Sequence, residues 1–216
     1  MKNSFSDYQL SLNLQGKDGF GLLTAENYRD YLTTYYLVPS LTKFLIESPD
    51  ARREKYLQEN AWIAWENGSP SFAFDDYVTH IGRMKGLPAF DDFGKGQPEP
   101  LLFGNDTINA RHFTDFSLRY TSKNIDANVE EEVQKLVNMM NVFYFLKNDK
   151  GNVTQHWWLR NGTSDNHASQ TVMINLATML ENMDKSVNTW IFWDGDHCAD
   201  NDPEGFIEWI KNITED

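Results

Sequence analysis

The chain has 216 residues, of which 40% are hydrophobic and 14% aromatic, enough to form a sizeable core and to exclude general disorder. Its 19 basic and 32 acidic side chains give a formal net charge of −13. This charge opposes non-specific binding to nucleic acids and docking to anionic membranes, because both surfaces are themselves negative. The single cysteine, Cys198, excludes an intrachain disulfide framework and a cysteine-rich metal site.

No stretch of the sequence approaches the roughly 18 apolar residues of a membrane span. The N-terminus also lacks the apolar core of a signal peptide, and the compartment stays open. Acidic residues cluster between Asp194 and Glu204, but this segment does not fit a calcium-binding EF-hand loop. Ala199 stands where that loop needs glycine, and Gly205 stands where it needs glutamate. We therefore expect a solvated acidic loop, with neither metal nor cofactor.

Residues 1–150 are predicted to form helices separated by loops. Thr24 is placed to cap a helix over 25–36, and a further helix is expected from Phe74 to Lys85. Between them, Ser48-Pro49-Asp50 is a typical helix start, with a cap, a proline at the first position and an acid in the first turn. Four glycines and three prolines within residues 86–104 predict a long ordered loop.

The most regular helical pattern in the chain follows Asn128. Asn128 and Glu131 form a near capping box, which predicts a helix start. The apolar residues after it recur at helical spacing and define one face: Val133, Leu136, Val137, Met140 and Phe143 or Tyr144.

The pattern changes near residue 150, so we divide the chain into a mostly helical region, 1–150, and a second region, 151–216. The second region is predicted to contain a strand over 156–160, a helix over 168–183, a strand over 187–193 and a last helix. Asp202 caps this last helix, Pro203 takes its first position, and Phe206, Trp209 and Ile210 face inward. Such alternation is typical of parallel strands with crossover helices, an α/β fold. Because two strands do not form a stable sheet, this region is expected to be the edge of a larger one.

Two polar residues follow the two predicted strands. Asp165 lies after the first strand and His197 after the second, and ligands of open parallel sheets bind beyond such carboxyl ends. A carboxylate beside an imidazole orients the ring and makes it a general base, so the two residues are a candidate catalytic pair. In the alternative interpretation, Asp165 only caps the following helix and His197 is an ordinary loop histidine.

A nucleophile for this pair is missing from the sequence. The Gly-x-Ser-x-Gly elbow of α/β-hydrolases is absent, and Gly68-Ser69-Pro70-Ser71 lacks the second glycine. Cys198 adjoins His197, but neighbours in a loop rarely aim their side chains at each other, so an inert thiol is the competing interpretation. The seven tryptophans could stack on a sugar or phenolic ring, although their positions in strands and helices favour a core role.

Several segments together resemble bacterial tannase-like and feruloyl-esterase-like serine hydrolases. These segments occur in the order found in that family, from about residue 75 to the C-terminus: 83–91, 102–107, 110–114, His156 to Asp165, Trp193 to His197, and 206–210. The resemblance implies an α/β-hydrolase fold with a large, mostly helical lid inserted before the last strands. It also implies that this chain is the C-terminal part of such an enzyme, without the half that holds the nucleophile.

Residue by residue, the resemblance makes Asp165 the acid and His197 the base of a catalytic triad. Lys85 and Glu99 match a lysine and a glutamate of the tannase lid that contact the hydroxyls of a galloyl ring. The family has a third contact, an aspartate, two residues after the triad acid, and His167 stands at that position here. His167 is therefore also a candidate substrate-binding residue, with a different chemistry.

The predicted function is the C-terminal portion of a serine carboxylic-ester hydrolase acting on a small phenolic or related ester. The serine would come from outside this chain, either from an N-terminal α/β-hydrolase half or through another assembly such as self-association. Two alternatives are a non-catalytic carbohydrate- or phenol-binding module and a purely structural fragment. A tryptophan-rich chain without a nucleophile is compatible with both.

Overall fold

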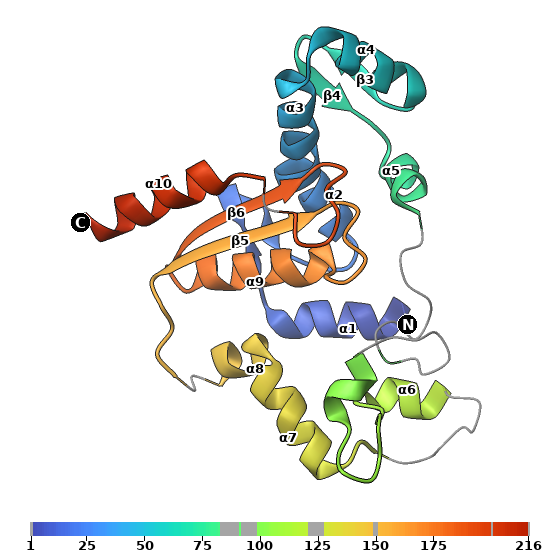
Figure 1. Cartoon of the computed structure of the whole chain (residues 1–216), viewed down its shortest axis with the longest axis vertical. Coiled ribbons are helices and arrows are strands. Elements are labelled where there is room, and N and C mark those ends of the chain that lie inside the picture. The colour runs from blue at the N-terminus through green and yellow to red at the C-terminus, as the bar shows by residue number, and fades with distance from the viewer. Residues whose placement is uncertain are drawn as a thin grey trace. The chain divides into compact units, whose positions relative to one another are not determined.

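The computed structural model describes residues 2–82, 91, 99–120, 128–148, 151–199 and 201–215. By packing, the chain divides into two compact units. The first combines residues 1–84 with 154–216, and the second is the segment between them, 85–153 (Figure 1). All seven tryptophans lie in the first unit, so their fluorescence reports on that unit alone.

The first unit is built on two parallel strands, β5 (His156–Gly162) and β6 (Ser186–Phe192). They pair in register from His156 opposite Ser186 to Gly162 opposite Phe192. The crossover helix α9 (Gln170–Asn182) packs on one face of the pair, as Figure 1 shows. The predicted order of strand, helix and strand is confirmed, with each boundary within two residues.

The buried face of α9 differs in part from the predicted one. Val172 is exposed, whereas Met173, Ile174, Ala177 and Leu180 are buried. These four recur at helical spacing and cover the strands, so the helix is rotated slightly from the face that the sequence suggested.

A long helical path covers the outer edge of β6. It consists of α2 (Tyr28–Leu32), the single π turn η2 (Thr33–Leu37) and α3 (Val38–Glu47). The predicted helix over 25–36 therefore continues further, because Pro39 falls at the start of α3, where its missing N–H is tolerated. The hydroxyl of Ser40, which is buried, donates to the backbone oxygen of Ile191 in β6 at 2.7 Å.

After α3 the chain forms α4 (Asp50–Glu59), the hairpin of β3 (Ala64–Glu66) and β4 (Ser69–Ser71), and α5 (Phe74–Ile81). The predicted cap at Ser48 is wrong: its hydroxyl donates to Phe44 in α3, and Pro49 precedes α4. The hairpin turn holds Asn67 and Gly68, both at positive φ, the conformation that a tight two-residue turn requires.

The N-terminal segment, for which the sequence predicted no element, also packs into the first unit. It comprises α1 (Lys2–Leu12), β1 (Gln15–Gly16), the short turn η1 (Lys17–Gly19) and β2 (Gly21–Leu22). Two buried amides, Gln9 of α1 and Asn175 of α9, exchange hydrogen bonds of 3.0 and 3.3 Å. Because both amides are buried, replacing either one would leave the other without a hydrogen-bond partner.

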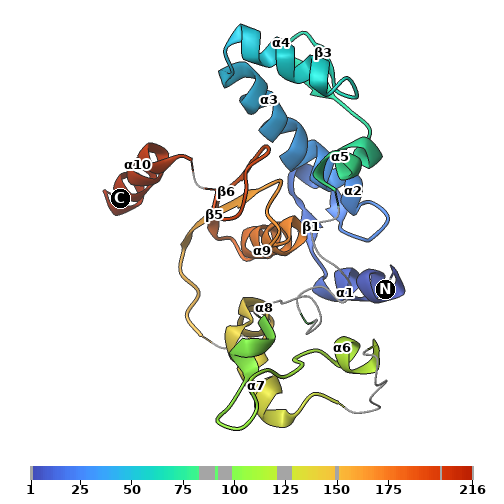
Figure 2. The ribbon, with the colours of Figure 1, turned by 45° about the vertical axis from the view of Figure 1, so that its right-hand side comes forward.

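The last helix, α10 (Pro203–Thr214), begins as predicted: Asp202 accepts a hydrogen bond from Gly205 N–H at 3.0 Å. Phe206 and Trp209 pack against Trp158 of β5. None of the residues of α10 is buried, however, and Ile210 is 40% exposed instead of facing a core. Figure 2 shows the helix extending away from the two strands.

The second unit is helical in the residues described. It contains η4 (Glu99–Phe103), α6 (Asp115–Tyr120), α7 (Glu131–Met140) and α8 (Val142–Lys147). The one long helix predicted after Asn128 is broken at Asn141, whose side chain caps α8 by accepting from Phe143 N–H. Because of this break, the apolar residues of the predicted face are not all buried. Val133 and Phe143 are buried, but Met140 is exposed.

An aspartate organises one end of this unit. Asp91 is buried, and its carboxylate accepts backbone N–H bonds from Phe113 and Thr114 at 3.0 and 2.9 Å. It also contacts His112 Nδ1 at 2.8 Å. A fully bonded carboxylate of this kind fixes the loop before α6.

The division of the chain differs from the one expected at residue 150. One boundary, at 153/154, lies close to it, but residues 1–84 pack with the strands instead of with 85–153. The reason is that η2 and α3 cover β6. Among the described residues no helix has both the length and the apolar character that crossing a membrane requires.

Leu41→Ala should destabilise the first unit, because Leu41 is fully buried in α3. We expect a loss of about 2–5 kcal/mol in the free energy of unfolding, measured by tryptophan fluorescence in urea. Ile46→Ala, on the same helix but 59% exposed, is the control and should change stability by no more than about 0.5 kcal/mol. Equal effects of the two variants would contradict the packing of α3.

Candidate functional site

Asp165 and His197 lie on adjacent loops at the carboxyl ends of β5 and β6. His197 Nδ1 is 3.1 Å from Asp165 Oδ1 and 3.2 Å from Oδ2. The parallel register brings the two loops to the same edge because Gly162 and Phe192, the last residues of the strands, are paired. The juxtaposition expected from the sequence is thus present.

Backbone and side-chain hydrogen bonds hold the two loops together. Thr163 is fully buried; its N–H donates to Phe192 O at 2.9 Å, and its Oγ1 accepts from Asp194 N–H at 2.7 Å. Ser164 N–H donates to Gly195 O at 2.9 Å. The loops approach so closely that a Cβ on Gly162 would lie 2.0 Å from this Gly195 oxygen. A glycine is therefore required where β5 ends.

Asp165 is both buried and ionised. Its side chain is only 4% exposed. Burial by itself raises the pKa of the carboxyl, but the N–H groups of Ala168 and His167 and the imidazole of His197 all lower it, and the resulting pKa lies below the ordinary value. The N–H bonds measure 2.9 and 2.7 Å, and Asn161 Nδ2 adds a contact of 3.1 Å to Oδ2. Asp165 therefore orders the turn before α9, as the alternative interpretation held, and also pairs with His197, as the catalytic interpretation held.

The ionised carboxylate fixes the tautomer of His197. A carboxylate only accepts hydrogen bonds, so Nδ1 must carry the proton and donate it. In the neutral ring Nε2 is then unprotonated and able to accept a proton. The His197 side chain is 47% exposed, and its ring centroid lies 4.4 Å from that of His167. An imidazole oriented in this way can act as a general base toward a group on its exposed side.

A second polar network, which the sequence did not suggest, supports the loop that carries His197. Asp194 Oδ2 accepts from the hydroxyl of Tyr56 at 2.6 Å, and Oδ1 contacts His80 Nε2 at 2.8 Å. Trp193 Nε1 donates to the same Tyr56 hydroxyl at 2.7 Å. Because α4 and α5 supply these partners from far away in the sequence, no local motif could have indicated the network.

Trp193 is itself a core residue, as the positions of the tryptophans favoured. It is 5% exposed and packs against the rings of Trp62, Phe72, Tyr77 and His80. This aromatic cluster fixes the point where the chain leaves β6 and so sets the start of the loop before His197.

Three other residues were candidates for the site: Lys85, Glu99 and Cys198. Lys85 lies outside the described residues. Glu99 is half-buried at the start of η4, in the second unit. Cys198 is exposed, beside His197 in the same loop. Over the residues the structure describes, no three His, Cys, Asp or Glu side chains come together as a metal site would need.

Solved structures with a similar fold include bacterial tannases. A tannase from Lactobacillus plantarum superposes with a TM-score of 0.82 at 27% identity, over 97% of this chain and 43% of that one. A Fusobacterium nucleatum tannase gives a TM-score of 0.78 at 31% identity, over 97% and 44%. A tannin acyl hydrolase in complex with ethyl gallate gives 0.80 at 26%, over 97% and 44%. No protein-family model and no curated protein sequence matches the chain.

The likeness therefore covers nearly all of this chain and less than half of each tannase. With identities of 26 to 31% it extends to sequence as well as fold. The chain has the tannase fold over a C-terminal portion of such an enzyme, and the resemblance found in its motifs is confirmed.

Gly162→Ala should separate the two loops, because the new methyl group would meet Gly195 O. We expect the downfield Nδ1 proton of His197, observed by NMR, to be lost or strongly shifted. Gly19→Ala is the control: its positive φ strains an alanine, but nothing surrounds it within 4 Å. An unchanged His197 signal in Gly162→Ala would contradict the close approach of the loops.

Stability should depend on pH through Asp165. Its folded pKa lies below the ordinary value of 3.8, so the ionised carboxylate stabilises the fold above about pH 4, and this contribution disappears as the pH falls through the folded pKa. Asp165→Asn lacks that contribution at every pH. The gap in unfolding free energy between wild type and Asp165→Asn, measured in urea, should therefore narrow from pH 6 toward acid. A gap that stays constant or widens would be inconsistent with the lowered pKa.

Proposed function

We propose that the chain supplies the acid and the base of a serine carboxylic-ester hydrolase, with the nucleophile provided by polypeptide outside this chain. The observation that carries the proposal is the bonded pair of buried, ionised Asp165 and half-exposed His197 at the carboxyl edge of two parallel strands. The tannases with which it shares 26 to 31% identity give the class of reaction, cleavage of a carboxylic ester.

In the proposed reaction, His197 Nε2 takes the proton of a serine hydroxyl as its oxygen attacks the ester carbonyl. The C–O bond to the alcohol then breaks, and the imidazolium returns the proton to the departing alcohol. Water then replaces the alcohol: His197 takes a proton from the water as its oxygen attacks the acyl carbon. The bond from that carbon to the serine oxygen breaks, the imidazolium returns the proton to the serine oxygen, and the acyl group leaves as a carboxylic acid. Asp165 holds the Nδ1–H throughout and stabilises the positive ring.

Three features support an incomplete assembly that a further polypeptide completes. Among the described residues β5 has no strand on its other edge. The side-chain oxygen of Asn161, a buried residue of β5, has no hydrogen-bond partner in that same part of the chain. The apolar side of α10 is left open, with Ile207 67% exposed. Open strand edges and unpaired buried acceptors are costly, so we expect the complementing part to add a strand that pairs with the free edge of β5.

The substrate in this proposal is a small ester with a phenolic acyl group. His167 is a candidate contact because its ring adjoins that of His197. The second unit, with Glu99 and Lys85, is proposed to act as the lid that covers the ester, as the resemblance implies. An imidazole at position 167 donates or accepts one hydrogen bond where a carboxylate would only accept, which would change the preferred ring hydroxylation.

The test is complementation. The chain alone should not hydrolyse ethyl gallate or p-nitrophenyl esters, because it lacks the nucleophile and the donors that stabilise the oxyanion. Co-expressed with the part of the Fusobacterium nucleatum tannase that it does not match, it should form an active complex. In that complex His197→Ala should lower kcat by roughly 10⁴-fold or more, and Asp165→Asn by about 10⁴-fold.

His156→Ala is the matched control, since His156 is an exposed histidine at the far end of β5. It should leave kcat within about twofold of the unmodified complex. Hydrolysis by the isolated chain that disappears in His197→Ala would overturn the external nucleophile. A complex that forms and hydrolyses equally well with His197→Ala would overturn the assignment of the pair.

A further inference from the structure

The helix α5 contacts both of the loops that carry the candidate pair. Tyr77 is its buried residue, and His80, almost one turn later, has a side chain that is 22% exposed. Residues three apart lie on the same face of a helix. The two residues between them, Val78 and Thr79, are exposed. One face of this helix, with Tyr77 and His80, therefore meets the rest of the first unit.

Tyr77 reaches the loop after β5 through one intermediate side chain. Its hydroxyl lies 3.0 Å from Gln170 Oε1 and 2.8 Å from Nε2, and Gln170 Nε2 donates to the backbone oxygen of Thr163 at 2.9 Å. All three residues are buried, so a bond lost here leaves a buried polar group unpaired. Thr163 precedes Asp165 by two residues. The contact therefore lies close to the acid of the pair.

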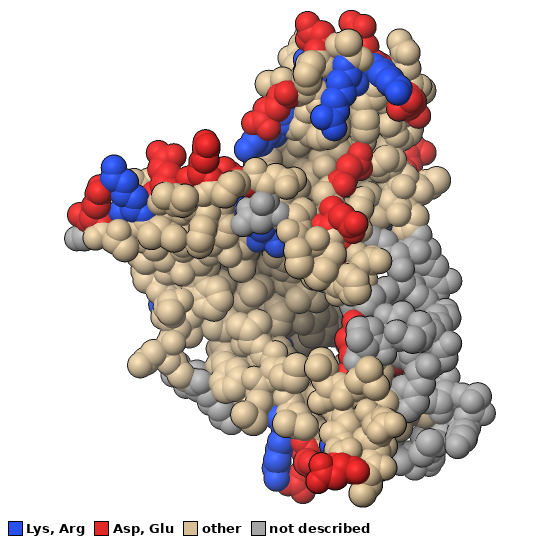
Figure 3. Space-filling view, viewed as in Figure 1, with Lys and Arg blue, Asp and Glu red and all other residues tan. Residues whose placement is uncertain are grey.

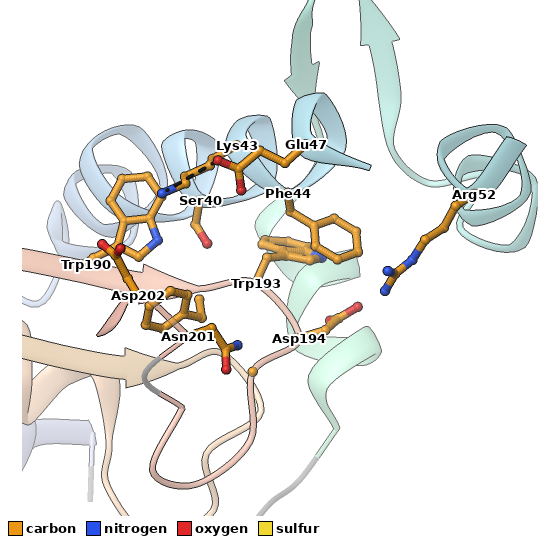
Figure 4. A pocket seen from close by; sticks show the side chains of 12 residues that line it. Ser40, Lys43, Phe44, Glu47, Arg52, Trp190, Trp193, Asp194, Asn201 and Asp202 are labelled. Atoms are coloured by element: carbon orange, nitrogen blue, oxygen red, sulfur yellow. Dashed lines mark ion pairs between the residues drawn. The ribbon is translucent and has the colours of Figure 1, made fainter. Parts of the chain in front are cut away.

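His80 reaches the loop after β6 directly. Its Nε2 lies 2.8 Å from Asp194 Oδ1, and because a carboxylate only accepts hydrogen bonds, Nε2 is the donor. Figure 4 shows Asp194 on this loop, with its carboxylate directed toward α5, the pale green helix. Asp194 precedes His197 by three residues. This contact therefore lies close to the base of the pair.

The neighbouring helix α4 holds the second oxygen of the same carboxylate. Tyr56 donates to Asp194 Oδ2 at 2.6 Å and accepts from Trp193 Nε1 at 2.7 Å. Figure 3 shows acidic and basic side chains of α4 at the surface, whereas the Tyr56 ring packs against that of Phe44, with centroids 4.9 Å apart. Two helices outside the strand pair thus fix the orientation of Asp194.

The two contacts of α5 converge, because the residues that they reach are bonded to each other. Thr163 Oγ1 accepts from Asp194 N–H at 2.7 Å, so the hydrogen bonds run from α5 through both loops and back to α5. The rings of Tyr77 and His80 also pack on Trp193, the residue after β6, with centroid distances of 5.6 and 6.2 Å. The helix therefore fixes the position of one loop relative to the other.

We propose that Tyr77 and His80 are positioning residues for His197, and that α5 sets the spacing of the two loops. Tyr77 acts through Gln170, and His80 acts through Asp194. The effect on turnover rests on the proposed ester hydrolysis, whereas the geometry of the pair is measurable in the chain alone. The competing explanation is that both side chains only fill the aromatic cluster. In that case, removing a hydrogen-bonding atom without changing the packing would not reach His197.

The experiment follows the ring nitrogens of His197 by ¹⁵N NMR in the 216-residue chain. Their shifts report which nitrogen carries the proton, and His197→Ala assigns them. Tyr77→Phe removes one oxygen atom and keeps the ring, and His80→Leu removes the donor to Asp194. In both variants the Nδ1–H form of His197 should no longer predominate. His80→Gln should restore the wild-type shifts, because its amide also donates a hydrogen bond.

Thr79→Val is the matched control, since it removes a hydroxyl from the exposed side of α5 that bonds to Asp75 within the same helix. Leu41→Ala controls for lost stability, because Leu41 is buried in α3 away from the two loops. Both controls should keep the wild-type shifts of His197. Unchanged shifts in either Tyr77→Phe or His80→Leu would overturn the proposal, and so would equal changes in either control.

In the complex formed by complementation, Tyr77→Phe and His80→Leu should each lower kcat by about 10- to 100-fold and leave KM within about twofold. The reason is that a misplaced general base slows the chemical step without changing how the ester binds. A raised KM with an unchanged kcat would contradict the positioning role. An inactive unmodified complex would overturn the proposed hydrolysis, and the ¹⁵N shifts would still decide whether α5 positions the pair.

Discussion

The arrangement of the candidate site depends on how β5 and β6 end. Both strands stop at the same level, and the buried side chain of Thr163 bridges the two loops through backbone atoms on either side. Gly162 allows the loops to touch, because no side chain separates it from Gly195. Asp165 and His197 follow these fixed points by only a few residues, so their hydrogen bond needs little further ordering of the chain. The same closeness makes the site sensitive to changes that never touch either side chain.

The two outer edges of the strand pair differ in whether another element covers them. On the β6 side, α3 closes the edge, and the buried hydroxyl of Ser40 satisfies a backbone oxygen that would otherwise need a further strand. On the β5 side, the described residues offer nothing comparable. A sheet closed on one side and open on the other can grow in one direction only. The chain superposes over nearly its whole length on less than half of each tannase.

The sequence predicted features that depend on neighbours along the chain. The strand–helix–strand order, the cap at Asp202 and the meeting of Asp165 with His197 follow from local periodicity and the handedness of crossovers. The sequence did not predict the features that tertiary contacts determine. Ser48 is recruited by the end of α3, the helix after Asn128 breaks at Asn141, and residues 1–84 join the strands through side chains such as Ser40. Tyr56 and His80, which bond to Asp194, lie more than one hundred residues from it in the sequence, so no local motif could have predicted these contacts.

A histidine bonded to a carboxylate does not by itself identify a site, since the described residues contain three such pairs. His112 with Asp91 and His80 with Asp194 are as short as 2.8 Å, tighter than His197 with Asp165. Exposure separates them: the side chains of His112 and His80 are 14% and 22% exposed, whereas that of His197 is 47% exposed. The first two imidazoles have a structural role. His112 shares the carboxylate of Asp91 with backbone N–H groups, and His80 packs within an aromatic cluster. Among these three, only His197 combines a buried, ionised partner on one nitrogen with a half-exposed ring at the carboxyl edge of parallel strands. That combination, more than bond length, is what a general base requires.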